Sequence, residues 1–243
     1  MQIVKDLYLV CGFPFEIHAN IHAVKYSKGI ILFDCGTNLM EAKLAEKNLA
    51  YWGLGDLPVT HVFVTHEHQD HGGNSKYFQD KGAKIYAGPV DAEHIANADI
   101  ETIDFALIED AVPCPGIIEL KDEEVVEVEE LKIRCIHIPG HTPGSMLYQV
   151  DLNGLSVCFG GDSIRVGTNA QSAILGWTGG VDYDREVYIQ SLLKAGELVR
   201  SGSLKCDVLC GGHFQPMVGD AWKCINMASR SAFENLRPLP NII

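Results

Sequence analysis

"THEHQDHGG", residues 65–73, places three histidines and an aspartate within six positions. The stretch directly follows the apolar run Val62, Phe63 and Val64, which predicts a strand that ends where the histidines begin. A single histidine at such a place would be an ordinary core or surface residue. Four metal-binding side chains in one turn instead raise the question of whether other parts of the chain complete a site.

The residue types in this turn are those of a transition-metal site. Side chains two positions apart on an extended chain share one side, so we expect His66 and His68 to converge, with Asp70 and His71 following where the chain bends. Neutral imidazoles and carboxylates suit zinc and similar first-row ions. Four such groups packed this closely are costly unless a cation neutralises them. The turn therefore predicts metal binding.

Three further strand-like segments end in a glycine-containing stop followed by a metal-binding side chain. They are "IRCIHIPGH", which ends at His141, "SVCFGGD", which ends at Asp162, and "CDVLCGGH", which ends at His213. Functional groups gather at strand ends in α/β folds because the strands hold the converging loops rigidly. We expect these three side chains to meet the turn at 65–73 in one site.

The chain as a whole reads as one α/β (α+β) domain over residues 1–243, with 47% hydrophobic residues and no internal repeat or linker. Single strands are expected at 2–10, 18–26, 29–36, 59–65, 83–88 and 206–213, and pairs of strands around a turn at 123–138 and 145–161. Helices are expected at 38–53, 72–82, 89–98, 184–202 and 219–237. Asn153-Gly154 is a hairpin signal. Two strand-rich halves with intervening helices predict two sheets between helical layers.

Composition argues against several kinds of partner. With 32 acidic against 19 basic residues and a net charge of −13, the surface is a poor match for nucleic acid. The chain has no run of roughly 18 apolar residues and no signal-peptide pattern after Met1, so we expect no membrane association and a cytoplasmic location. The expected partner is a small molecule. Oligomeric state is not predicted.

Eight cysteines are scattered along the chain without a CxxC pair. Most of them lie in apolar, strand-like surroundings, which is typical of small buried residues in a reducing compartment. A redox or metal role for Cys206 and Cys210 is the alternative.

Taken together, these motifs resemble the metallo-β-lactamase superfamily over nearly the whole chain. The matching residues are His66, His68, Asp70 and His71 in "THEHQDH", His141 in "PGHTPGS", Asp162 in "GGDS", His213 in "GGH" and, as the family's structural aspartate, Asp34 in "LFDCG". The resemblance implies a four-layer αββα sandwich, with two mixed sheets flanked by helices, and a metal-dependent hydrolase. Every ligand of the family's two-metal pattern has a match.

The resemblance also implies how the ligands are shared. His66, His68 and His141 would hold one divalent ion, Asp70, His71 and His213 would hold the second, and Asp162 would bridge the two. Zinc is the expected ion, with iron or manganese as alternatives. A hydroxide bridging the ions would be the nucleophile, and Asp70 would transfer its proton to the leaving group. Asp34 would orient a ligand or the metal-binding turn.

Differences from the sequence patterns of individual subfamilies narrow the range of expected substrates. Flavodiiron proteins carry glutamate at the position of His68, and the common secreted β-lactamases carry cysteine at that of Asp162, so neither activity is expected. Glyoxalase II has a helical glutathione-binding domain after its last histidine, for which residues 214–243 are too few. Acyl-homoserine lactonases have a tyrosine where Arg165 stands. A small-molecule ester, thioester or lactone is the expected substrate.

Three alternative functions stay open: a mononuclear iron persulfide dioxygenase, a phosphodiesterase and a catalytically inactive binding module. The complete second ligand set, Asp70, His71 and His213, argues against the dioxygenase. An inactive relative would be expected to lack ligands, and none is lacking.

The segment after Asp162 is expected to form the wall of the substrate pocket. It carries Arg165, as an anchor for a carboxylate or phosphate, together with Asn169 and Trp177. The plain alternative is that Trp177 packs in the core and Arg165 forms a surface ion pair. Residues 99–118 have weak periodicity and two prolines; they predict either a lid over the site or a surface loop.

Overall fold

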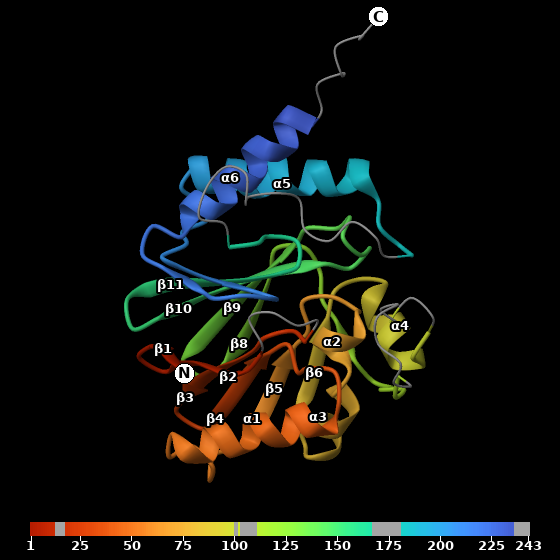
Figure 1. The fold of residues 1–243 in the computed structure, drawn as a ribbon, viewed down its shortest axis with the longest axis vertical. Helices are drawn as coiled ribbons and strands as arrows, with labels where there is room; N and C mark the ends of the chain where they lie inside the picture. Colours follow the sequence, from red (N-terminus) through yellow and green to blue (C-terminus); the bar gives the residue numbers. More distant parts are fainter. Residues whose placement is uncertain (13–17, 100–101, 103–110, 167–180, 236–243) are drawn as a thin grey trace, which may run out of the picture.

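The computed structural model describes residues 1–12, 18–99, 102, 111–166 and 181–235, which form four layers (Figure 1). Helices α1 (Leu39–Tyr51) and α3 (Ser75–Asp80) cover the outer face of one sheet. Helices α5 (Arg185–Arg200) and α6 (Trp222–Asn235) cover the outer face of the other. The predicted αββα sandwich is confirmed.

The first sheet contains seven strands, which lie side by side in sequence order. They are β1 (Gln2–Val4), β2 (Leu7–Cys11), β3 (Ile21–Tyr26), β4 (Gly29–Phe33), β5 (Val59–Phe63), β6 (Lys84–Ala87) and β7 (Ile118–Glu119). Strands β1 to β4 pair antiparallel and β4 to β7 parallel. Every residue of β4 is buried, as its unbroken apolar run predicts for a strand covered on both faces.

The second sheet has six strands in the order β13-β12-β11-β10-β9-β8. They are β8 (Glu124–Val128), β9 (Leu131–His137), β10 (Met146–Leu152), β11 (Leu155–Gly161), β12 (Val208–Gly211) and β13 (Met217–Val218). Strands β11 and β12 pair parallel, and the other neighbours pair antiparallel. The hairpin between β10 and β11 turns at Asn153 and Gly154, both with positive φ, as the Asn-Gly signal predicts.

Aromatic rings between the two sheets fix the strand ends that lead to the polar loops. Phe33 ends β4 and Phe63 ends β5, and the rings of Phe33 and Phe159 are stacked with centroids 3.6 Å apart. Phe33 also stacks with Phe63 at 5.6 Å. This packing holds the last residues of β4 and β5, and Phe159 near the end of β11, in fixed relative positions, so the loops that follow these strands start from rigid points.

Several boundaries differ from the sequence prediction. The strand expected over 2–10 is two strands, because the chain turns at Asp6, whose φ is +64°. The helix expected from Pro89 is α4 (Asp91–Asn97), which begins two residues later, after Val90 with a φ of +71°. A short helix α2 (Gln69–Gly72) and the two-residue strands β7 and β13 were not predicted, since elements this short have no hydrophobic period to recognise.

Other expectations are tested only in part. Half of the segment 99–118, residues 100–101 and 103–110, lies outside the described residues. Within the described part, Cys114 is buried and its amide donates to the Ile95 carbonyl, and a lid stays a prediction. All eight cysteines are described, buried and free, as expected for small core residues. No helix in the described part of the chain has the length and apolarity needed to cross a bilayer.

Candidate metal centre

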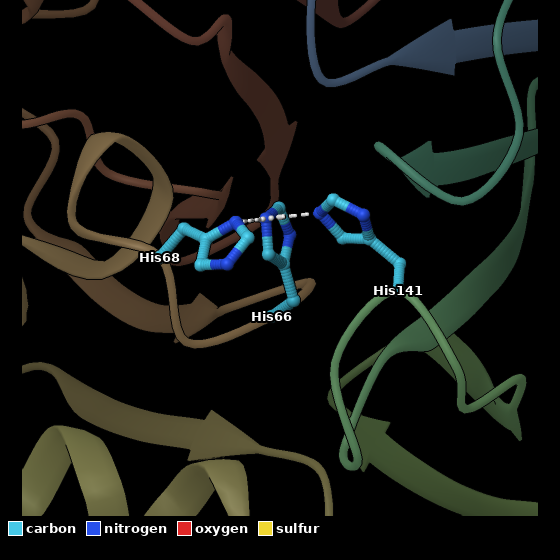
Figure 2. Close-up of side chains that lie close together, drawn as sticks. All are labelled: His66, His68 and His141. Atoms are coloured by element: carbon cyan, nitrogen blue, oxygen red, sulfur yellow. Dashed lines mark hydrogen bonds between the residues drawn. The ribbon is translucent and has the colours of Figure 1, made fainter. Parts of the chain in front are cut away.

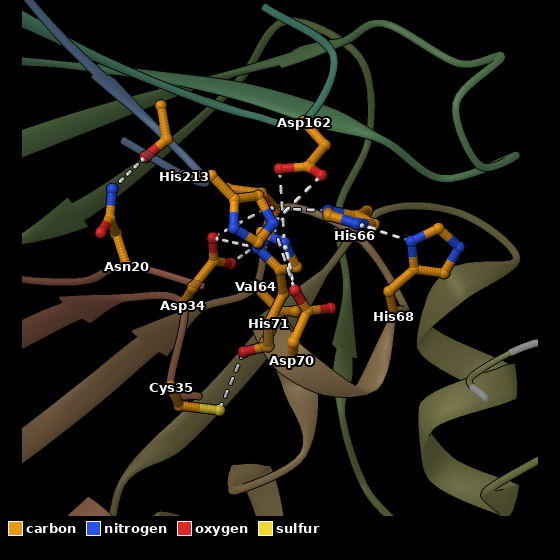
Figure 3. A network of polar contacts seen from close by, with 12 residues as sticks. Asn20, Asp34, Cys35, Val64, His66, His68, Asp70, His71, Asp162 and His213 are labelled. Atoms are coloured by element: carbon orange, nitrogen blue, oxygen red, sulfur yellow. Dashed lines mark hydrogen bonds and ion pairs between the residues drawn. The ribbon is translucent and has the colours of Figure 1, made fainter. Parts of the chain in front are cut away.

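All seven predicted ligands follow the ends of four strands and converge on one place (Figures 2 and 3). Strand β5 ends at Phe63, and the metal turn, which we define as residues 65–71, follows it. His66 and His68 lie in bends, not in an extension of the strand, and Asp70 and His71 lie in α2. The other three ligands, His141, Asp162 and His213, follow β9, β11 and β12.

Three histidines form the first group, which we call the three-histidine half (His66, His68 and His141; Figure 2). The Nε2 atom of His66 lies between the other two rings, 3.0 Å from Nδ1 of His68 and 3.2 Å from Nε2 of His141. All three side chains are buried. Their nitrogen atoms therefore face a common point that solvent barely reaches.

Asp70, His71, Asp162 and His213 form the second group, the carboxylate half (Figure 3). Nε2 of His71 lies 3.4 Å from one oxygen each of Asp70 and Asp162. Nε2 of His213 lies 3.2 Å from Asp70 Oδ2 and 3.3 Å from Asp162 Oδ2. Asp162 also groups with His66, so its carboxylate faces both halves.

Asp34 holds the carboxylate half from behind. Its Oδ2 accepts hydrogen bonds from His71 Nδ1 at 2.8 Å and from the Thr65 hydroxyl at 2.9 Å, while its Oδ1 accepts from the Thr65 amide at 2.7 Å. These bonds fix the ring of His71 so that Nε2 points at Asp70 and Asp162. Asp34 thus lies beside His71 and the start of the metal turn.

Gly212 is required by the close approach of His71 and Asp162. A Cβ atom at this position would lie 2.2 Å from Asp162 Oδ1 and 2.5 Å from His71 Cε1. Asn20 fixes the same loop, because its side-chain amide donates to the carbonyls of Gly211 at 3.2 Å and Phe214 at 2.7 Å. The loop that carries His213 is therefore locked against the chain leading into β3 and against the carboxylate half.

Burial and neighbouring rings keep two rings of the three-histidine half, His66 and His68, neutral. Burial, with His71 and His141 adding to it, lowers the pKa of His66 well below its ordinary value. The pKa of His68 falls to about 3, again chiefly through burial and then through His141. Both rings are therefore uncharged at neutral pH, which is the form that ligates metal.

The carboxylate half is charged in the metal-free protein. Burial alone would lower the pKa of His71, but Asp70, Asp34 and Asp162 outweigh it and raise this pKa to about 9. In the same way, Asp162 and Asp70 overcome burial and raise the pKa of His213 to about 11. The pKa values of both carboxyls are lowered against burial, Asp70 mainly by His71 and Asp162 mainly by His213.

The donor set fits two divalent cations. Tetrahedral zinc with bonds of about 2.05 Å to nitrogen separates its ligand nitrogens by about 3.3 Å, close to the 3.0 and 3.2 Å found in the three-histidine half. In the carboxylate half, His71 Nε2 is buried and makes no hydrogen bond to any described residue. A cation between this nitrogen and the two facing carboxylates would satisfy all three groups.

The predicted substrate contacts are only partly visible. The guanidinium carbon of Arg165 lies 5.1 Å above the ring of Phe214, a cation–π contact next to His213. Asn169 and Trp177 lie outside the described residues. The three predicted substrate roles therefore stay predictions.

Sequence reasoning missed the residues that hold the ligands in place. Thr65, Asn20 and Asp91 all hydrogen-bond within or next to the centre. Thr65 begins the quoted stretch, so its place before His66 was the available signal. Asn20 and Asp91 had none, because their partners are remote in sequence.

A family model described as the metallo-beta-lactamase superfamily matches residues 16–213. The chain belongs to this superfamily. Members of this superfamily are metal-dependent hydrolases. In this chain, the histidine and aspartate groups of the centre could hold metal ions.

The chain matches curated relatives over only part of their length and of its own. An uncharacterized protein of Aquifex aeolicus (strain VF5) is 31% identical over 133 residues, 54% of this chain and 58% of the relative. A hydroxyacylglutathione hydrolase of Maricaulis maris (strain MCS10) is 28% identical over 123 residues, 50% of this chain and 38% of the relative. The chain thus spans between about two fifths and three fifths of these relatives.

Solved structures share the fold. A B3 metallo-β-lactamase with an active-site glutamic acid has a TM-score of 0.71 at 21% identity, covering 97% of this chain and 89% of its own. A metallo-β-lactamase family protein from Thermus thermophilus has a TM-score of 0.69 at 21% identity, with coverages of 96% and 80%. At these identities the similarity shows the metallo-β-lactamase fold alone.

Proposed function

We propose that the protein is a binuclear metal-dependent hydrolase of a small-molecule ester, thioester or lactone. The observation that carries the proposal is the pair of adjoining ligand groups, three buried histidines beside two histidines and two carboxylates, with Asp162 facing both. Zinc is the ion we propose for both halves. The match to the superfamily over residues 16–213 supports hydrolysis as the reaction class.

The chain itself would orient the reacting groups. Bound there, two divalent cations would acidify a water molecule and polarise the scissile carbonyl. Asp70 is ionised, because neighbouring histidines lower its pKa, and His213 lies 3.2 Å from its Oδ2. An ionised carboxylate fixed at this place can take the proton of the attacking water and return it to the leaving group. Asp34, through His71, keeps that arrangement fixed.

Thioesters have support from sequence relatives. Two curated proteins named hydroxyacylglutathione hydrolase match 50% and 46% of this chain, at 28% and 30% identity. The matched stretches cover only 38% and 36% of those proteins, so the substrate class is proposed without glutathione as its carrier. Arg165, held over Phe214, is the proposed anchor for a negatively charged group on the substrate.

Metal content tests the proposal directly. Protein purified without chelator should contain about two zinc ions per chain by plasma mass spectrometry, as the two ligand groups require. Asp162→Ala should lower this number and reduce hydrolysis by more than about 100-fold, since loss of a mere outer partner of a ligand already costs about 10- to 100-fold. Asp151→Ala, at an exposed position of β10, is the matched control and should retain both ions.

A single iron per chain would overturn the proposal and favour persulfide oxidation instead. Where two ions are found, a panel of lactones, thioesters and esters identifies the substrate class. The panel should contain each compound with and without a carboxylate. A preference for the charged members that disappears in Arg165→Met would support the anchor, and an equal preference would exclude it.

A further inference from the structure

Helix α4 presents a buried carboxylate to two of the loops that supply metal ligands. Asp91 is fully buried and accepts three hydrogen bonds, from the Glu67 amide at 2.9 Å, the Thr142 hydroxyl at 2.7 Å and the Gly144 amide at 2.5 Å. Glu67 stands between His66 and His68, and Thr142 follows His141. One carboxylate is thus a single residue away from each ligand of the three-histidine half.

The backbone around this carboxylate is packed as tightly as glycine permits. A Cβ atom on Gly88 would lie 1.9 Å from the carbonyl oxygen of Gly144. A Cβ atom on Gly144 would lie 2.6 Å from Asp91 Oδ1. The segment before α4 and the loop that carries His141 therefore touch backbone to backbone, and Asp91 bonds across that contact.

Val90 is strained in order to place Asp91. Its φ of +71° and ψ of −58°, with the Asp91 amide bonded to the Pro89 carbonyl at 2.9 Å, form a γ-turn of the strained positive-φ kind. A β-branched residue with positive φ is a genuine outlier. Such strain persists only where surrounding structure imposes it, and it gathers at functional sites.

A second residue of α4 also contacts the metal turn. His94, one turn along α4, places its Nδ1 2.5 Å from Glu67 Oε2. Glu67 is therefore fixed by its amide through Asp91 and by its carboxylate through His94. Burial, with Glu67 adding to it, raises the pKa of Asp91 well above its ordinary value, against the three donated bonds. A carboxyl this costly to bury needs all three donors in place.

We propose that Asp91 is a positioning residue for the three-histidine half: it ties the metal turn to the loop of His141 and so sets the spacing of His66, His68 and His141. The inference rests on the proposed function, because it assigns Asp91 a role toward the metal centre. Asp91 belongs to neither ligand group. It acts through the backbone of Glu67 and Gly144 and through the hydroxyl of Thr142.

The decisive variant is Asp91→Asn, which keeps the shape of the side chain but replaces one acceptor oxygen by a donor NH₂. Loss of an outer partner typically costs 10- to 100-fold in metal affinity. We expect a loss of about that size for zinc in the three-histidine half and little change in the carboxylate half. Stepwise cobalt titration should show a changed visible absorption spectrum for the three-histidine ion alone.

Asp122→Asn is the matched control. Asp122 also accepts three hydrogen bonds, from the His137 amide and twice from Lys194, but its side chain is exposed and these partners lie outside the metal turn. This variant should keep both affinities and the cobalt spectrum. If Asp91→Asn lowers only the melting temperature and leaves both affinities and the spectrum unchanged, Asp91 is merely structural and the inference is overturned.

If Asp91→Asn does not fold, Thr142→Val tests the positioning role of Asp91 instead. It removes one donor to Asp91 while keeping the volume of the side chain, and it should weaken zinc in the three-histidine half by a smaller factor. Unchanged affinity in this variant would also overturn the inference. Failure of the wild-type protein to bind two ions would instead overturn the proposed function, so the two failures are distinguishable.

Discussion

The pKa values of histidines are shifted in opposite directions in the two halves of the centre. Burial and repulsion from neighbouring rings keep His66 and His68 of the three-histidine half neutral, with the pKa of His68 at about 3. The carboxylate half carries Asp70 and Asp162, which raise the pKa of His71 to about 9 and that of His213 to about 11. In the metal-free protein, protons on these two histidines therefore compensate the carboxylates. Metal binding should replace protons in this half only.

Each half also has its own buried aspartate behind it. Asp34 accepts from the Thr65 amide and from His71 Nδ1, whereas Asp91 accepts from the Glu67 amide and from the loop that follows His141. The two carboxylates thus bracket His66 through the amides on either side of it. One orients a ligand by a direct bond, and the other sets the distance between two loops.

The largest expected difference between the halves is their response to pH. A cation entering the carboxylate half must displace protons from His71 and His213, since both pKa values lie above 7. Zinc affinity there should rise with pH, by up to about 100-fold per unit for two released protons. The affinity of the three-histidine half should depend much less on pH above pH ~5, because burial keeps the rings of His66 and His68 neutral. Titration calorimetry in buffers of different protonation enthalpy counts the protons released at each step.

Equal proton release in the two steps would break this comparison. It would mean that the histidines of the first half are charged before metal binds, or that Asp70 and Asp162 do not keep His71 and His213 protonated. Asp151→Ala, at an exposed position of β10, serves as the control for unspecific proton release.

A smaller effect is expected from Asp34→Asn. The substitution exchanges a charged acceptor for a neutral amide beside His71 and removes one of the carboxylates that raise its pKa. We expect zinc affinity of the carboxylate half to fall about 10- to 100-fold, with the three-histidine half unchanged. Stepwise cobalt titration separates the two affinities. A loss shared equally by both halves would show that Asp34 acts through the whole metal turn, through its bond to Thr65.

The clustering of the candidate ligands could be predicted from sequence, while the groups that hold them in place could not. Each ligand follows an apolar run and a turn, and glycine stops of the kind that precede Asp162 and His213 are visible in any sequence. Asp91 gives no such signal, because its three partners lie 24, 51 and 53 residues away. Asp34 was identified through the family resemblance, and its bond to His71 spans 37 residues. Contacts across such separations follow from the sheet pairing and have no local pattern.

The fold shows the same division. Strands and helices with a clear hydrophobic pattern were predicted, such as β4 from its unbroken apolar run and α5 from its amphipathic spacing. Strands β7 and β13 have two residues each and exist only because a neighbouring strand pairs with them. The start of α4 was misplaced for a related reason. Pro89 is a favourable first residue of a helix, but the contact between Gly88 and Gly144 and the bonds of Asp91 impose a γ-turn at Val90 instead.

The smallest predicted effect tests that γ-turn. Asp34 itself has a φ of +58°, which aspartate tolerates, whereas Val90 at +71° is strained. Val90→Gly should relieve about 1–3 kcal/mol of strain and lose about 0.5–1 kcal/mol to the greater freedom of the unfolded chain. The free energy of unfolding should rise by roughly 1 kcal/mol, measured by urea denaturation of the metal-free protein. Zinc affinity should stay unchanged, because glycine adopts this φ without moving Asp91.

Val90→Ala is the control that separates backbone strain from side-chain contacts. Alanine keeps the penalty of a positive φ, and the Val90 side chain is 45% exposed, so little burial is lost and stability should hardly change. If Val90→Gly were instead destabilising, contacts of the valine side chain would outweigh the free-energy cost of the positive φ at Val90. The positive φ before Asp91 would then be no sign of net strain. If it stabilised the protein but weakened the three-histidine half, the valine would be needed to hold Asp91 rigid. In that case the two aspartates would differ in one further respect. Asp34 itself has the positive φ of its turn, whereas the turn that places Asp91 depends on the positive φ of the preceding residue, Val90.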